Sequence, residues 1–182
     1  MFCHAICDDR NFFATVFDGK HVIELGAGTG LVSVLVDKLF SCGSICVTDL
    51  DSHVELIRHN LELNRASENC QAQALDWQDC RLDPYDVVLI FECVYNESLY
   101  DPLIQSLDQL FSETTVGFLG LTRLFAKPSF FDKLLNAGFV YTMVPEESLP
   151  AKYSDDLAYR DVGLFVVRRV SSTFRVQHLS LS

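Results

Sequence analysis

A short apolar run that ends in alternating glycines constrains the fold of this chain more than any other feature. Residues 21–25 read His-Val-Ile-Glu-Leu, and Gly26, Gly28 and Gly30 follow. Apolar residues then recur at helical spacing over residues 31–39. The pattern predicts a buried strand, a tight turn and a helix. Ligands of open α/β sheets bind beyond the carboxyl ends of the strands, and glycines let a backbone approach a ligand closely. This turn is therefore a candidate binding site.

The rest of the chain alternates strand-like runs with helix-like ones. Further strands are expected over residues 45–48, 71–75, 86–91, 115–121, 139–144 and 162–167, and further helices near Ser52, Leu99 and Pro128. Ser52 and Glu55 match the capping box that begins a helix. Irregular chain between Pro145 and Asp161 separates the last two strands, which suggests a terminal antiparallel hairpin. We expect an α/β fold, with a Rossmann-like, doubly wound, mostly parallel sheet of seven strands and a C-terminal antiparallel hairpin.

Composition limits the classes of protein and partner. The chain has 182 residues, 49% of them hydrophobic, which suits one domain with a sizeable core. Its formal net charge of −11 and its lack of a basic run disfavour nucleic acid, so a basic protein segment is the easier partner. No stretch reaches the ~18 apolar residues of a membrane span, and the first residues do not resemble a signal peptide. We expect no membrane partner and a cytoplasmic location, with the nucleus as the alternative.

The seven cysteines indicate reduced thiols rather than a disulfide framework. Their number is odd, and no C-x-x-C pair occurs. Cys3, His4 and Cys7 lie close together in the sequence, but no second ligand pair follows them. No metal site is therefore expected.

Acidic residues follow the second and third expected strands. Asp49 comes where a carboxylate can accept hydrogen bonds from both ribose hydroxyls of a nucleoside, and its alternative role is a helix N-cap. Asp76 and Trp77 follow the strand over residues 71–75. There an acid can accept a hydrogen bond from an adenine amine and an indole can stack on the ring, although a lone tryptophan is more often a packing residue.

A second polar group, Glu92, Tyr95 and Asn96, follows the strand over residues 86–91. A carboxylate, a phenol and an amide at one strand end can orient a substrate amine. The alternative role is helix capping, which we weigh equally for Asn96, whereas we favour function for Glu92 and Tyr95. A nicotinamide dinucleotide is disfavoured, because the third glycine of G-x-G-x-x-G would fall at Leu31.

Together these motifs resemble the seven-β-strand methyltransferases, and most of all the methyltransferase-like 21 group of protein-lysine methyltransferases. The resemblance extends over roughly residues 18–169 and rests on the sequences at 24–30, 48–50, 75–77, 92–95 and 99–103. It implies that S-adenosylmethionine is the cofactor and that Glu92 and Tyr95 line the methyl-transfer site. It also implies a set of cofactor-binding residues: Glu24, Gly26, Ala27, Gly28, Gly30, Asp49, Asp76, Trp77, Phe91 and Asn96.

Two features depart from the pattern of this family. Its acidic motif usually begins with Asp, where this chain has Glu92, and the extra methylene shifts the carboxylate enough to matter for positioning. The family also carries an upstream segment with a tryptophan, which nothing before the first strand matches. We expect an N-terminal segment over residues 1–17 that is shortened relative to the family, a methyltransferase domain over 18–170 and a flexible tail over 171–182. The chain would then be a fragment, a shortened variant or a divergent member.

The resemblance implies an enzyme that transfers a methyl group from S-adenosylmethionine to a lysine side chain of a protein. Neither the substrate protein nor the oligomeric state follows from the sequence. Enzymes that methylate bases commonly show Asn-Pro-Pro-Tyr where residues 92–95 read Glu-Cys-Val-Tyr, which disfavours that class. Two alternatives stay open: a methyltransferase-fold protein that acts on a small molecule, and a cofactor-binding or interaction protein without catalysis.

Overall fold

The structure, a computed structural model, describes residues 2–123, 125–145 and 161–170. Within these residues seven strands form one sheet in the order β3-β2-β1-β4-β5-β7-β6. The strands are β1 His21–Leu25, β2 Ser44–Asp49, β3 Cys70–Ala74, β4 Tyr85–Phe91, β5 Phe111–Thr122, β6 Phe139–Met143 and β7 Val162–Arg169. Strands β1 to β5 pair in parallel, and β7 pairs antiparallel with both β5 and β6. The expected doubly wound, mostly parallel sheet with its terminal antiparallel hairpin is confirmed.

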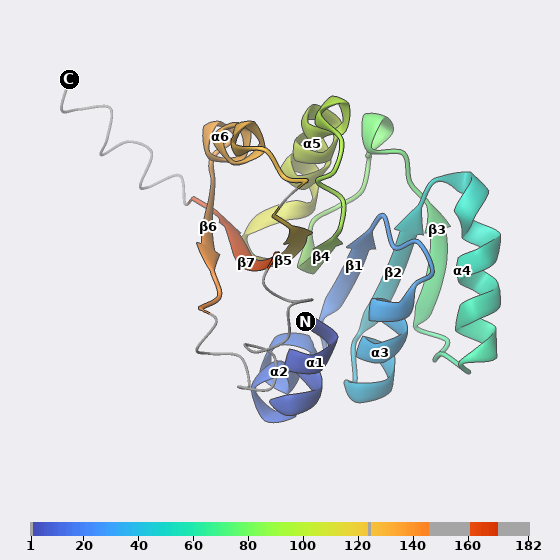
Figure 1. Cartoon of the computed structure of the whole chain (residues 1–182). Coiled ribbons are helices and arrows are strands. Elements are labelled where there is room, and N and C mark those ends of the chain that lie inside the picture. Colours follow the sequence, from blue (N-terminus) through green and yellow to red (C-terminus); the bar gives the residue numbers. More distant parts are fainter. Residues whose placement is uncertain (1, 124, 146–160, 171–182) are drawn as a thin grey trace, which may run out of the picture.

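Helices cover both faces of the sheet (Figure 1). They are α1 Phe2–Asp8, α2 Arg10–Phe17, α3 Leu31–Leu39, α4 Asp51–Leu63, α5 Tyr100–Leu110 and α6 Pro128–Asn136, with 3₁₀ turns η1 Trp77–Asp79 and η2 Glu97–Leu99. Successive side chains of a strand point to opposite faces of the sheet, so the hydrophobic core has two parts, one on each face. Val22 of β1 belongs to the buried cluster that includes residues of α1 to α4, whereas its neighbour Ile23 belongs to the cluster that includes residues of α5 and α6. Both faces of the parallel strands are thus buried, as the apolar runs predict.

The N-terminal helices α1 and α2 pack against the sheet through phenylalanines. Phe2 lies with its ring centroid 4.7 Å from that of Phe91 and 5.2 Å from that of Phe118. Phe17 of α2 is fully buried and stacks on Phe40 at 5.1 Å. The segment before the first strand is therefore part of the hydrophobic core.

The prediction of a capping box at Ser52 is wrong. Helix α4 begins two residues earlier than a Ser52 cap would place it, at Asp51. Its N-cap is Leu50, which makes no side-chain capping hydrogen bond. Oδ1 of Asp49 accepts a hydrogen bond from the Leu50 N–H at 2.7 Å, directly before the first residue of the helix. Ser52 lies in the first turn, where its hydroxyl contacts Nδ1 of His53.

One further boundary differs from expectation, and two predicted segments lie outside the described residues. Phe111, expected at the end of a helical stripe, begins β5, so that this strand starts earlier than residue 115. The irregular chain expected between Pro145 and Asp161 falls mostly on residues 146–160, which lie outside the described residues, as does the tail over 171–182. Among the helices described, none combines the length and apolar character that a bilayer crossing requires.

Candidate functional site

A cavity of about 370 Å³ opens beyond the carboxyl ends of β1, β2, β3 and β4. The predicted residues that line it are Gly26, Gly28, Asp49, Asp76, Trp77, Glu92 and Tyr95. They come from four separate strand ends, which the parallel pairing of β1 with β2 and β4, and of β2 with β3, brings to one edge of the sheet. The site expected from the strand ends is therefore one continuous space.

The glycine turn is built on backbone conformations that favour glycine. Gly26 and Gly28 have φ values of 59° and 58°. A Cβ on Gly26 would lie 2.9 Å from Sγ of Cys93 and 3.1 Å from the Trp77 ring, whereas one on Gly28 would meet no atom within 4 Å. The first glycine is thus required by close packing. The second leaves open space above the backbone, where a ligand can approach.

Asp49 is fixed against this turn by backbone donors. Its Oδ2 accepts a hydrogen bond from the Gly28 N–H at 2.8 Å, and its Oδ1 accepts the Leu50 N–H already described. Nδ1 of His53, one turn along α4, lies 3.4 Å from Oδ1. The two carboxylate oxygens have about four lone-pair sites, so further donors such as sugar hydroxyls can bind at the cavity side.

Asp76 and Trp77 form another wall of the cavity. Oδ1 of Asp76 accepts a hydrogen bond from the Gln78 N–H at 2.9 Å. Asp76 is thereby the N-cap of η1, which follows β3. The carbonyl of Trp77 accepts a hydrogen bond from the Ser106 hydroxyl at 3.0 Å, and its indole packs against the core. Trp77 therefore packs on the core, as a lone tryptophan often does, and it also lines the cavity, where stacking on a base stays a prediction.

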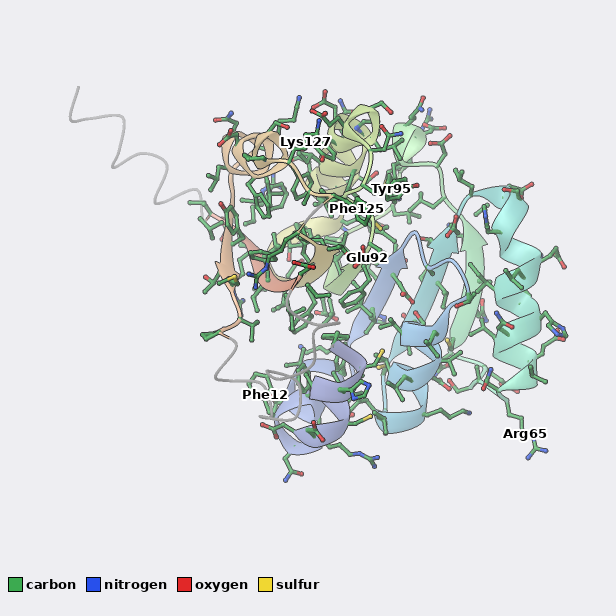
Figure 2. The ribbon with its side chains drawn as sticks, in the orientation of Figure 1. Phe12, Arg65, Glu92, Tyr95, Phe125 and Lys127 are labelled. Atoms are coloured by element: carbon green, nitrogen blue, oxygen red, sulfur yellow. The ribbon has the colours of Figure 1, made fainter. Side chains whose placement is uncertain are left out.

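Glu92 and Tyr95 follow the end of β4, on the edge of the sheet that the cavity faces (Figure 2). Glu92 has a φ of 55°, in the left-handed region that side chains other than glycine rarely adopt. Its carboxylate accepts hydrogen bonds from the backbone N–H of Thr122 at 3.3 Å and from the Thr122 hydroxyl at 3.1 Å. Tyr95 is 62% exposed. The pair offers a carboxylate held by Thr122 and an exposed phenol at the mouth of the cavity.

Glu24, predicted to bind the cofactor, does not line the cavity. It is almost fully buried, and its carboxylate accepts hydrogen bonds from both the N–H and the hydroxyl of Ser33 on α3. Burial raises the pKa of this carboxyl to about 7, against the opposing effect of the Ser33 donors. The carboxylate thus joins β1 to α3 beneath the glycine turn.

Four other predicted residues also lie outside the cavity lining, in structural positions. The Ala27 N–H donates to the carbonyl of Thr48 at 2.9 Å, and Gly30 is the N-cap of α3. Phe91 packs on Phe2, as described above. Oδ1 of Asn96 accepts a hydrogen bond from the Ser98 N–H at 3.1 Å, so Asn96 takes the helix-capping role that was its alternative.

Sequence reasoning missed several residues that line the cavity. They are Leu50, His53, Leu75, Gln78, Cys93, Leu99 and Pro102. Most directly flank a predicted residue, so the position next to a strand end was the available signal. Cys93 is buried, and its thiol donates to the carbonyl of Leu25 at 3.2 Å. His53 is four residues from Asp49 on a helix, a spacing that brings the two side chains together.

Comparison with known proteins identifies the family of this chain. A profile described as lysine methyltransferase matches residues 3–137, which is most of the chain. The chain belongs to the lysine methyltransferase family. The matched region of this family member includes every residue that lines the cavity.

Two curated relatives are similar in sequence to part of this family member. It is 42% identical to EEF1A lysine methyltransferase 3 of Xenopus tropicalis over 107 residues, which are 57% of this chain and 47% of that protein. It is 35% identical to protein N-lysine methyltransferase METTL21A of Danio rerio over 108 residues, 56% of this chain and 49% of that one. The chain thus matches about half the length of these relatives.

Among solved structures, the ribosomal protein L11 methylase of Lactobacillus delbrueckii subsp. bulgaricus superposes with a TM-score of 0.66. The superposition covers 91% of this chain and 76% of that one at 17% sequence identity. The likeness shows that the two proteins share a fold.

Proposed function

We propose that this chain binds S-adenosylmethionine in the described cavity and transfers its methyl group to a lysine side chain of a protein substrate. The observation that carries the proposal is the convergence of Gly28, Asp49 and Glu92 on one cavity in a member of the lysine methyltransferase family. The relatives are named for protein lysine, which supports that substrate class over a small molecule.

The residues present fit the proposed cofactor. The cavity volume lies within the range of small-molecule sites, about 300–1,000 Å³. The acceptor oxygens of Asp49 suit ribose hydroxyls, and the indole of Trp77 suits a planar base. The open space above Gly28 leaves room for a ligand beside the backbone. The carboxylates around the cavity also complement a cationic sulfonium.

The side chains of this chain then act by position. When bound, S-adenosylmethionine supplies a methyl group that is already activated for attack. A free lysine amine has a pKa near ~10.4 and must be neutral to attack. The Glu92 carboxylate, held by Thr122, and the Tyr95 phenol orient the incoming ammonium while its proton leaves to water. Most of the rate gain comes from orientation and from exclusion of water, and no strong general base is assigned.

The proposal is tested by incubating the protein with methyl-labelled S-adenosylmethionine and a cell extract. A discrete labelled protein band is expected, with the label recovered as methyllysine after hydrolysis. Glu92→Ala should lose the band, and Glu62→Ala, an exposed acid on α4, should keep it as the matched control. Label in small molecules only, or no label with cofactor still bound, would contradict protein-lysine transfer.

We also propose that the protein acts in the cytoplasm and without nucleic acid. The formal net charge of −11 supports a basic protein partner over a phosphate backbone. Cell fractionation with a tagged chain tests the location. Transfer of label to nuclease-sensitive material would contradict the proposed partner.

A further inference from the structure

The carboxylate of Glu92 is held from one side by a single residue of the neighbouring strand. Thr122 ends β5, and it donates through both its backbone N–H and its hydroxyl, one to each oxygen of Glu92. The two residues are 30 positions apart in the sequence. A carboxylate bound at both oxygens in this way is restricted in its direction as well as its distance.

The end of β5 is shaped to receive the end of β4. The Glu92 N–H donates to the carbonyl of Gly120 at 2.9 Å. A Cβ on Gly120 would lie 2.4 Å from the Phe91 ring, so only glycine leaves room for that ring. These contacts fix the backbone on both sides of Glu92 and set the Thr122 donors opposite its side chain.

Glu92 also keeps an unfavourable backbone conformation, with φ at 55°. Such conformations persist only where the surroundings determine them, and they cluster at functional sites. Here the surroundings are Gly120 on the backbone and Thr122 on the side chain. The strained backbone and the two donors together fix the carboxylate of a residue that lines the cavity.

We propose that Thr122 is the positioning residue for Glu92, and that its hydroxyl sets the carboxylate in the orientation that methyl transfer requires. The inference rests on the proposed function of the same cavity. Thr122 does not line the cavity. It acts through Glu92, and its loss should lower the rate of transfer without changing the affinity for the cofactor.

The chain offers a matched pair of variants. Thr122→Val keeps the backbone donor and the β-branched shape, which suits a strand, but removes the hydroxyl. Thr122→Ser keeps the hydroxyl and removes only a methyl group. A role in packing would be preserved in the valine variant, whereas a role in hydrogen bonding would be preserved in the serine variant.

The first arm measures the initial rate of label transfer from saturating methyl-labelled S-adenosylmethionine to protein in a cell extract. Thr122→Val should transfer about 10- to 100-fold more slowly than wild type, since a hydrogen bond to a charged group is lost. Thr122→Ser should stay within about 3-fold of wild type, because it keeps that bond. Affinity for S-adenosylhomocysteine, measured by calorimetry, should be the same in all three proteins. The inference would be overturned if Thr122→Val transferred label at the wild-type rate, or if both variants lost the same fraction of that rate.

The second arm needs no activity. In ¹⁵N-labelled protein the amide proton of residue 122 should move upfield in Glu92→Ala, because its charged acceptor is gone, and should stay in place in Asn96→Ala. An unmoved resonance in Glu92→Ala would overturn the contact itself. If the wild-type protein labels no protein, the proposed function fails, whereas normal wild-type labelling with an unaffected Thr122→Val sinks only the role of Thr122.

Discussion

The two halves of the cavity are built in different ways. At the ends of β1 and β2 the contacts run through the backbone: the Gly28 N–H meets Asp49, and the Ala27 N–H meets the carbonyl of Thr48. At the ends of β4 and β5 the Glu92 carboxylate accepts from the Thr122 N–H and, in addition, from the Thr122 hydroxyl, a contact between two side chains. We refer to these as the glycine half and the glutamate half.

The difference suggests that the glycine half serves the cofactor and the glutamate half serves the substrate. A backbone turn that accepts only glycine at its tight positions presents the same surface whatever lies elsewhere, which suits an invariant cofactor. A side-chain pair across two strands can be changed without disturbing that turn, which suits a variable substrate. The account therefore predicts that the two halves can be broken separately.

The largest expected effect separates transfer from binding in the glutamate half. Glu92→Ala should lower the rate of methyl transfer by about 100- to 1,000-fold, because the group that orients the amine is removed. Calorimetric affinity for S-adenosylhomocysteine should stay within about 3-fold of wild type, since the ribose contacts are intact. A parallel loss of affinity would show that the two halves are not separable.

The second effect is a pH dependence of stability that arises from Glu24, which is buried beneath the glycine turn. Burial raises the pKa of Glu24 to about 7, above its ordinary value near 4.5, so the folded state holds the proton more tightly than the unfolded state. This stabilisation is complete below the unfolded pKa and is lost as the pH rises through the folded pKa. The free energy of unfolding should therefore fall by about 2 to 3 kcal/mol between pH 5 and pH 8.

The matched control for this pH dependence is Glu24→Gln, which cannot titrate at this position. Urea unfolding of both proteins across the pH range gives the difference. A wild-type curve that runs parallel to that of Glu24→Gln would remove Glu24 as the cause.

The third effect weakens the cofactor alone. Asp49→Ala should reduce affinity for S-adenosylhomocysteine by about 10- to 100-fold, because hydrogen bonds to a charged acceptor are lost. Transfer should recover at high cofactor concentration, unlike in Glu92→Ala, and this contrast sharpens the comparison of the two halves. Asp51→Ala, an exposed acid two residues on, serves as the control. Unchanged affinity in the calorimeter would take Asp49 out of the site.

The smallest effect tests the packing inside the glycine half. Gly26→Ala and Gly28→Ala place an L side chain at nearly the same positive φ, at a cost of about 1 kcal/mol each. Gly26→Ala should lose a further ~1 to 2 kcal/mol, because its Cβ meets Cys93 and Trp77. Chemical denaturation of the two variants measures the difference. Equal stabilities would contradict the close packing at Gly26.

The glycine half was largely predictable from the sequence, and the reason is local. Glycine spacing after an apolar run predicts the turn, and parallel strands bring Asp49 beside it. Glu24 shows the limit: it belongs to the same motif, but its carboxylate turns to Ser33, nine positions away on a helix whose rotation no motif specifies. The motif thus predicts where Glu24 lies along the chain, but not that its carboxylate binds Ser33.

The glutamate half was predictable only in part. Glu92 and Tyr95 follow from their position at a strand end and from the family resemblance. Thr122 does not, because its place opposite Glu92 depends on the register that pairs Phe91 with Gly120. A shift of one residue would turn the Thr122 side chain to the other face, and no pattern in the sequence fixes that register.

The most direct test of the central claim is a crystal structure of this chain with S-adenosylhomocysteine. The account predicts the ribose hydroxyls within hydrogen-bond distance of Asp49, the nucleoside beside Gly28, and the sulfur on the side of Glu92. A nucleoside bound at any other place, with this cavity filled by the protein's own side chains, would contradict it.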